Sequence, residues 1–402
     1  MSSVRQPDGG QVRDEGFPEA FERIASTIET AVQGKPDQVR LAVTCLLAGG
    51  HLLIEDLPGV GKTLLARCLA ASVQASMKRI QFTPDLLPSD ITGTDIYRPR
   101  SNEREFMPGP VFAHVVLADE INRATPRAQS ALLEAMEEHH VTVGGVTHPL
   151  PEMFLVVATQ NPVDMDGTYP LPEAQLDRFL MRIRMGYPDF AAEKRVLAAK
   201  VATVPGGGAV AEHGRPDENG RVAGHQARAG SEPAYDPLAP DRAWLPRDGQ
   251  WSDHRREARP VTAATSEAEV LALRGIARRT TVKDPVYDYL LRITRATRRL
   301  VAGQSDDPDP RSGRNGWARP AVAPSVGSLV LGASPRASVG LLHAAQVRAR
   351  VAGRDSVYPE DIKPLAVPVL AHRLSLSSAA VLAGRNAEDI VEEVLAAVAV
   401  PR

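Results

Sequence analysis

The chain has 402 residues, of which 47 are basic and 49 acidic, and its net charge of -2 excludes a general electrostatic attraction to nucleic acid or an anionic membrane. This length allows two or three domains with cores of their own, which excludes a small protein held together by disulfides. With 31 Gly, 33 Pro and few aromatic residues, part of the chain is expected to remain unfolded. The sequence lacks a run of about 18–20 apolar residues and the apolar segment of a signal peptide, which predicts a cytoplasmic protein without direct membrane insertion.

Residues 17–188 show the alternation of helical patterns and short apolar runs that is typical of an α/β domain. Five runs are apolar on both alternations, as strands buried on both faces of a parallel sheet would be. They lie at 51–54, 79–82, 115–118, 154–159 and 180–185, with helices expected at 36–48, 63–72 and 126–139. We therefore predict an αβα sandwich around a five-stranded parallel sheet, preceded by a disordered tail over residues 1–16.

From residue 189 the strand pattern stops and apolar residues recur at helical spacing, which predicts an all-helical domain over 189–375 and a helical tail over 376–402. The expected helices lie at 191–201, 266–278, 285–301, 335–351 and 359–370. Two segments inside this domain, 204–260 and 303–327, are rich in Gly, Pro and charged residues and cannot bury enough apolar surface to offset chain entropy. We expect both to be disordered loops whose flanking helices still pack together.

A phosphate-binding loop is predicted between the first strand and the helix after it, where the sequence is EDLPGVGKT. Its glycines allow backbone torsions closed to other residues, and its main-chain N–H groups would face a phosphate. Lys62 is expected to reach the β- and γ-phosphates of ATP, and Thr63 to bind Mg²⁺. The usual pattern begins with glycine where this chain has Asp56, but the intact GKT outweighs that departure. The residues expected around the nucleotide are Asp56, Leu57, Pro58, Gly59, Val60, Gly61, Lys62, Thr63 and Leu64.

Two acidic residues and an asparagine complete the predicted site. Asp119 ends the apolar strand VVLA and is expected to hold Mg²⁺, and Glu120 is placed to polarise the attacking water. Asn161 follows the strand FLVVAT and is placed to hydrogen-bond the γ-phosphate or that water, because the carboxyl ends of strands line such sites. The adjacent Asp and Glu favour an ATPase that carries its own base over a GTPase.

These motifs, taken with several others, resemble the MoxR family of AAA+ ATPases. Besides the phosphate-binding loop, the matching segments are RIQFTPDLLPSDITG (79–93), PGPVFAHVVLADEINRATPRAQSALLEAMEE (108–138), ATQNP (158–162), GTYPLPEAQLDRF (167–179) and GASPRAS (332–338). Together they extend along nearly all of the chain outside the N-terminal tail, the two loops and the extreme C-terminus. The resemblance implies a sheet order of 5-1-4-3-2, a helical lid, and homo-oligomeric rings, usually hexamers, that bind ATP at subunit boundaries.

The resemblance also assigns roles to two arginines. Arg178 of LDRF resembles the arginine finger donated to the neighbouring subunit's ATP, and Arg336 of SPRA resembles the lid arginine that touches the γ-phosphate of its own subunit. Both would supply positive charge where the transferred phosphoryl group accumulates negative charge. The alternative for each is a structural salt bridge. Arg123, just after the acidic pair, is expected to be a solvated arginine.

Two insertions also match the family. Residues 82–110 are too long and too rich in Pro and Asp to form one plain helix, and they resemble the family's insertion within helix 2. Residues 141–151 alternate around Gly144 and Gly145, which predicts a hairpin. In related rings such elements face the pore and move with the nucleotide state. A plain surface hairpin is the alternative.

The expected function is that of an ATP-hydrolysing, chaperone-like ATPase that assembles, activates or loads metal into partner proteins. The resemblance supplies the expected partner, a protein with a von Willebrand factor A domain. Two alternatives stay open: a magnesium-chelatase-like ATPase subunit, and a nucleotide-gated scaffold with little turnover, which the intact Glu120 and Asn161 disfavour. No nucleic-acid partner is expected, because the charges balance and the sequence lacks a basic strip rich in aromatic residues.

Overall fold

The computed structural model describes residues 16–56, 59–99, 102–161, 168–187, 190–191, 193–194, 261–301 and 327–401. The described residues up to Glu193 and those from Val261 onward belong to one compact unit. The disorder expected at 1–16, 204–260 and 303–327 falls almost entirely outside the described residues. Among the residues that are described, no helix is both long enough and apolar enough to cross a membrane.

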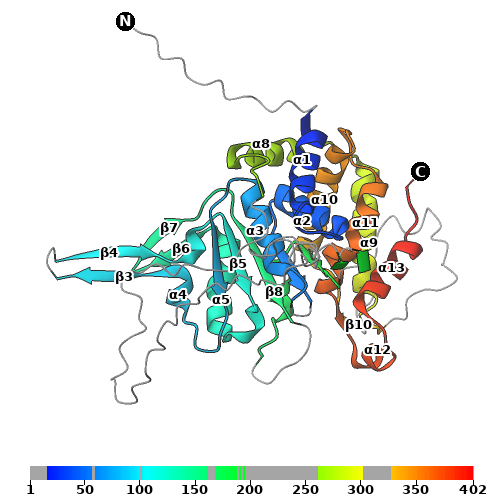
Figure 1. Cartoon of the computed structure of the whole chain (residues 1–402). Helices are drawn as coiled ribbons and strands as arrows, with labels where there is room; N and C mark the ends of the chain where they lie inside the picture. Colours follow the sequence, from blue (N-terminus) through cyan, green and yellow to red (C-terminus); the bar gives the residue numbers. More distant parts are fainter. Residues whose placement is uncertain are drawn as a thin grey trace, which may run out of the picture. The chain divides into compact units, whose positions relative to one another are not determined.

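A five-stranded parallel sheet forms the centre of the N-terminal part of the chain (Figure 1). Its strands are β1 (Leu52–Glu55), β2 (Met77–Gln81), β5 (Val115–Asp119), β8 (Leu155–Gln160) and β9 (Met181–Ile183), in the order β2-β5-β8-β1-β9. All neighbouring strands are parallel. The five predicted strands and the expected order 5-1-4-3-2 are therefore confirmed. We call the side of the sheet where the strands end the carboxyl edge, and the opposite side the amino edge.

Both faces of β1, β5, β8 and β9 are largely buried, which explains why these strands are mostly apolar on both alternations. The edge strand β2 instead exposes Lys78, Arg79 and Gln81, so the prediction that residues 79–82 are apolar on both alternations is wrong. In β5, Val115 and Leu117 belong to one hydrophobic cluster, and Val116 and Ala118 to another, because successive side chains of a strand point to opposite faces. The first cluster contains residues of α1 (Phe17–Glu29), α2 (Pro36–Ala48) and α3 (Lys62–Ser72), and the second contains residues of α5 (Pro126–Glu138). This is the predicted αβα sandwich.

Two antiparallel hairpins are inserted into this core and extend from it (Figure 1). The segment 82–110 forms α4 (Pro88–Thr92), β3 (Gly93–Arg98), β4 (Glu103–Pro108) and the short helix η2 (Pro110–Phe112). The predicted second hairpin is confirmed as β6 (His140–Val143) and β7 (Val146–Pro149), with Gly144 and Gly145 at φ values of 58° and 82° in the turn. The hairpins contact each other, since the ring of Phe106 stacks on that of His148 with centroids 3.9 Å apart.

The lid that follows is mainly helical. It consists of α8 (Glu267–Arg278), α9 (Asp284–Arg299), α10 (Pro335–Val351), α11 (Pro359–Leu370), η4 (Ala371–Arg373), α12 (Ser378–Leu382) and α13 (Ala387–Ala397). A two-stranded antiparallel sheet of β10 (Leu329–Leu331) and β11 (Ser375–Leu376) makes the prediction of an all-helical domain wrong in this detail. Strands of two and three residues are too short to produce a recognisable period. The helix predicted at 191–201 lies mostly outside the described residues.

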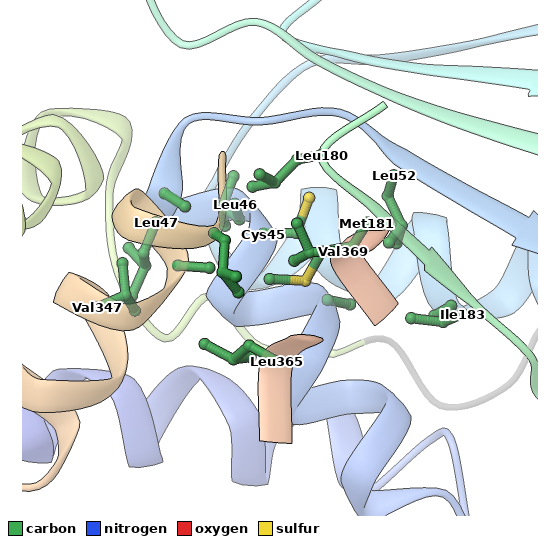
Figure 2. Packing of buried hydrophobic residues seen from close by; sticks show 14 of the residues in the cluster. Cys45, Leu46, Leu47, Leu52, Leu180, Met181, Ile183, Val347, Leu365 and Val369 are labelled. Carbon is green, nitrogen blue, oxygen red and sulfur yellow. The ribbon is translucent and has the colours of Figure 1, made fainter. Parts of the chain in front are cut away.

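The lid shares one core with the N-terminal helices and the sheet. Figure 2 shows Cys45 of α2 among Val369 of α11, Met181 of β9 and Leu180. Burial raises the pKa of the Cys45 thiol to about 12, so this thiol is neutral and packs as a small apolar group. Because α10 and α11 join the same cluster as the sheet, the described part of the lid is packed against the core rather than tethered beside it.

Candidate functional site

The phosphate-binding loop lies at the carboxyl edge, where β1 passes into α3. Asp56 continues the sheet by one residue, since its N–H donates to the Gln160 carbonyl at 3.1 Å. Gly59 and Gly61 adopt φ values of 85° and 94°, which other residues rarely do. Among the described residues, no atom lies within 4 Å of where a side chain on either glycine would begin. The loop therefore offers open main chain of the kind that receives a phosphate, while Leu57 and Pro58 lie outside the described residues.

Lys62 and Thr63 begin α3 directly after this loop, and Leu64 packs against the core. The ammonium of Lys62 donates to the main-chain carbonyl of Asp56 at 2.7 Å. Burial lowers the pKa of Lys62, an effect that the nearby carboxylates of Asp119, Asp56 and Glu120 partly offset. The ammonium is thus aimed across the open loop and is held by a neutral acceptor that a phosphate oxygen would outcompete.

Asp119 ends β5, and both oxygens of its carboxylate accept hydrogen bonds. Its Oδ1 accepts from the Thr159 hydroxyl at 2.6 Å, and its Oδ2 accepts from Arg79 at 2.5 and 3.1 Å. A carboxylate and the Thr63 hydroxyl are oxygen ligands of the kind that Mg²⁺ prefers. Thr63 and Asp119 therefore have the donor chemistry of the expected magnesium site, with Arg79 paired to Asp119 in this structure.

Glu120 has a backbone conformation that few residues other than glycine adopt, with φ 56° and ψ 50°. Its N–H donates to the Thr159 hydroxyl at 2.9 Å, and its carboxylate accepts from Gln81 at 3.2 Å and from Arg123 at 2.8 Å. Arg123 is exposed to solvent, as expected, and in addition pairs with Glu120. The carboxylate of Glu120, the proposed base, is thus hydrogen-bonded to Gln81 and Arg123 in this structure. To act on a water, it would have to break these contacts.

Asn161 follows β8 at the same edge, one residue beyond the Gln160 that bonds Asp56. Its main-chain carbonyl accepts from the side chain of Asn122 at 3.3 Å. The structure therefore gathers Lys62, Thr63, Asp119, Glu120 and Asn161 at the carboxyl edge.

Sequence reasoning missed three residues of this site: Arg79, Gln81 and Thr159. The first two alternate on β2, and β2 pairs with β5 so that Gln81 lies opposite Asp119. Polar residues at alternate positions in a strand expected to be buried were a usable signal, since buried polar groups need partners. Thr159 gave no such signal, because threonine is common in strands.

Arg178 and Arg336 lie elsewhere. Arg178 precedes β9, and it pairs with Glu137 of α5 at 2.9 Å. Arg336, in the first turn of α10, pairs with the other oxygen of the same carboxylate. Glu137 follows Met136, whose carbonyl contacts His51 at the start of β1 at 3.3 Å. Both arginines are therefore at the amino edge.

The length of β1 separates the two groups. Its four residues, at ~3.3 Å each, span about 13 Å, with the phosphate-binding loop at one end and His51 at the other. The expectation that Arg336 reaches the γ-phosphate of its own subunit does not match this arrangement. The reason is long-range: Ser334, just before α10, hydrogen-bonds the Asp177 carboxylate at 2.8 and 2.9 Å, which holds the start of α10 beside Arg178.

Comparisons with known proteins agree with this fold and site. Residues 51–181 match the sequence profile of the ATPase family associated with various cellular activities (AAA), and residues 327–394 match that of the AAA lid domain. The chain is 40% identical to the uncharacterized protein YeaC of Bacillus subtilis over 93% of this chain and 92% of that protein. It is 35% identical to chaperone MoxR1 of Mycobacterium tuberculosis, over 98% and 86% of the two chains.

A solved structure resembles the whole chain. It is that of a protein from Cytophaga hutchinsonii proposed to be an ATPase, with a TM-score of 0.72, 30% identity, and 97% of each chain covered. The AAA match contains the phosphate-binding lysine and the acidic pair, and the lid match contains Arg336. This chain belongs to the MoxR family of AAA+ ATPases.

Proposed function

We propose that this ATPase works as a homo-oligomeric ring, with six subunits as in the rings that the family implies, and that each ATP is hydrolysed between two subunits. The observation that carries the proposal is the division of the site: the loop, metal ligands and base lie at the carboxyl edge, and both arginines lie at the amino edge. One subunit alone cannot bring them together. A neighbour that presents its amino edge to the first subunit's carboxyl edge completes the site.

At such a boundary, residues of this chain have separate tasks. The loop N–H groups and Lys62 hold the β- and γ-phosphates, and Thr63 and Asp119 hold Mg²⁺, which neutralises phosphate charge. Glu120 accepts a proton from the attacking water once it leaves Gln81 and Arg123, and Asn161 orients that water or the γ-phosphate. The neighbour's Arg178 and Arg336 stabilise the charge that develops on the transferred phosphoryl group.

The client-handling surface is proposed to be the pair of inserted hairpins. Side chains on them are exposed although they are large and apolar, namely Ile96, Tyr97, Met107 and Val146. Contact between Phe106 and His148 joins the two hairpins, so that movement of one is passed to the other. This surface supports a remodelling role over the alternative of a scaffold, and the name of the relative MoxR1, a chaperone, agrees with it.

The client is proposed to be a protein with a von Willebrand factor A domain, which the ATPase assembles, activates or loads with metal. The second candidate is a magnesium-chelatase-type complex. A direct test adds each partner class to the purified ATPase and measures the turnover of ATP. The proposal expects the von Willebrand-type protein to raise turnover, and an Ile96→Ser and Tyr97→Ser variant to lose that rise while keeping basal activity. Stimulation only by the chelatase partner would overturn it.

A further inference from the structure

The segment that carries Arg178 is held by the lid. Arg373 of η4, whose side chain is 4% exposed, donates through Nε to the Asp177 carboxylate at 2.8 Å. Its two remaining nitrogens donate to four main-chain carbonyls: those of Asp177 at 3.2 Å, Phe179 at 2.7 Å, Leu180 at 3.1 Å, and Val369. A guanidinium has five N–H groups. All five N–H groups of Arg373 are used. Three of the four carbonyls belong to Asp177, Phe179 and Leu180, which lie within two residues of Arg178.

Two other lid residues hold the same segment. The Ser334 hydroxyl donates to the Asp177 carboxylate, and Nε2 of His372 contacts the Phe179 carbonyl at 3.0 Å. Burial keeps the pKa of His372 well below its ordinary value, so this ring is neutral and carries its proton on the nitrogen that donates.

The side chain of Arg178 is held differently from its main chain. It pairs with Glu137, and its buried Nε has no hydrogen-bond partner among the described residues. The main chain is therefore fixed by several bonds, while the guanidinium is left able to exchange one carboxylate for another anion.

Packing alone does not fix this junction. A cavity of about 450 Å³ lies between the two sides and is lined by Glu173, Ala174 and Asp177 from the core side, and by Arg298, Leu331–Pro335 and Arg373 from the lid. Polar contacts at the rim of this cavity therefore add to the apolar packing of Leu180 against the lid.

We propose that Arg373 is a positioning residue for hydrolysis: together with Asp177 and Ser334 it fixes the main chain around Arg178, so that the lid sets where the finger points. This rests on the proposed role of Arg178 at the neighbour's ATP. A displacement of the lid would move Arg178, and the Arg336 that starts α10, toward or away from the next subunit together.

The rival explanation is that Arg373 merely stabilises the fold. The lid offers a control for it, since Arg354 also pairs with a buried carboxylate. It makes two bonds, at 2.5 and 3.0 Å, with Asp361, whose side chain is 1% exposed. The bonds of Arg354 to Asp361 and Glu360 stay within the lid.

The test compares Arg373→Lys with Arg354→Lys in the full-length chain. Lysine keeps the charge but cannot span five acceptors, because its ammonium has only three donors and no planar fork. Misplacing a reacting group by about 1 Å can cost about 10²-fold in rate. We expect Arg373→Lys to lose about 10²-fold in kcat with an unchanged KM for ATP and intact assembly, and Arg354→Lys to keep the parent kcat.

Mixed rings give the sharper readout. Arg373→Lys subunits should regain activity with Glu120→Gln subunits, whose fingers are intact, and should not regain it with Arg178→Ala subunits. Rescue by Arg178→Ala, or equal kcat losses in the two lysine variants, would overturn the proposal. If Arg373→Lys does not fold, Asp177→Asn, which keeps an oxygen acceptor, must show the same pattern of rescue. A mixture of Glu120→Gln and Arg178→Ala subunits tests the proposed function separately. If that mixture recovers no activity, Arg178 does not act at the neighbour's ATP, whatever the role of Arg373.

Discussion

The two edges of the central sheet differ in what they contribute to hydrolysis. The carboxyl edge holds acidic and neutral groups around an open loop, with Lys62 as the cation aimed at the phosphates. The amino edge holds two arginines on one carboxylate, Glu137, which leaves that group with an excess positive charge. The carboxyl edge also holds Arg79 and Arg123, but these are paired with its own Asp119 and Glu120. Neither edge alone combines the open loop with arginines whose charge is in excess.

This difference is the physical basis of the proposed assembly. Parallel strands place loop residues at their carboxyl ends by geometry, but they place residues that precede strands, such as Arg178 before β9, at the other end. A subunit can bring its own edges no closer than the length of its strands, about 13 Å for β1. Catalysis by both edges requires two subunits, and the predictions below test this division.

The largest effect is expected from Arg178→Ala. An arginine finger is worth on the order of 10³ to 10⁵ in rate, so turnover should fall by that factor while ATP binding, which depends on the carboxyl edge, is kept. Steady-state ATPase assays and nucleotide titration measure the two. Arg348→Ala, which removes an exposed arginine from the last turn of α10, should be near the parent rate. Loss of ATP binding in Arg178→Ala would place Arg178 at its own subunit's nucleotide.

Glu120→Gln should cost about 10² to 10⁴ in turnover, the usual contribution of a general base. Glutamine keeps the size of the side chain and can still bond Arg123, so ATP binding and ring assembly should be retained. Single-turnover kinetics separate binding from chemistry. Hydrolysis at the parent rate would show that another group accepts the proton.

Glu137→Gln tests the amino edge with a smaller change. Partly exposed ion pairs contribute up to about 1 kcal/mol, so freeing both arginines from this carboxylate should change kcat by about fivefold at most, and upward. The ATPase rate at a protein concentration that saturates assembly is the measurement. A loss as large as that of Arg178→Ala would mean that Glu137 orients the arginines in the active state.

A further prediction concerns acid stability at the amino edge rather than turnover. His51 accepts from the Val156 N–H at 3.0 Å and contacts the Met136 carbonyl, and burial lowers its pKa to about 4. A base with a lowered folded pKa stabilises the fold above its unfolded pKa of about 6.5, and this contribution is lost as the pH falls toward 4. It should amount to about 2 kcal/mol between pH 7 and pH 5.

Denaturant unfolding of the parent and of His51→Asn at both pH values measures this contribution. The variant should be less stable at pH 7 but should lose about 2 kcal/mol less on acidification. The remaining pH dependence includes His343 and His372, whose pKa values burial also lowers. An unchanged pH dependence in His51→Asn would contradict the assignment.

The residues predicted for the carboxyl edge could be placed from the sequence, because each lies at or after the end of a strand and local order fixes its place. Asp119 after VVLA and Asn161 after FLVVAT are examples. The residues that sequence reasoning missed are hydrogen-bond partners on other strands, such as Arg79 on β2. Helix α1 was also missed as a separate element, although Phe17, Ala20, Phe21 and Ile24 have the spacing of a buried helical face.

The amino edge could not be predicted in the same way. The position of Arg336 depends on contacts between residues distant in sequence, such as Ser334 with Asp177 and Arg373 with Leu180. The periodic pattern of apolar residues in α10 does not indicate which end of the sheet lies beside the start of this helix. The family resemblance supplied a role for Arg336, and the packing of the lid supplied its place.

The most direct test of the division between edges mixes Arg178→Ala subunits with Arg336→Ala subunits and measures ATPase activity in rings shown to contain both. If both arginines serve the neighbour from one edge, no boundary in such rings has the pair intact, and activity should not recover. Glu120→Gln mixed with either arginine variant should recover part of the activity, as a positive control. Recovery in the mixture of the two arginine variants would show that Arg336 acts on its own subunit's ATP, and would contradict the account.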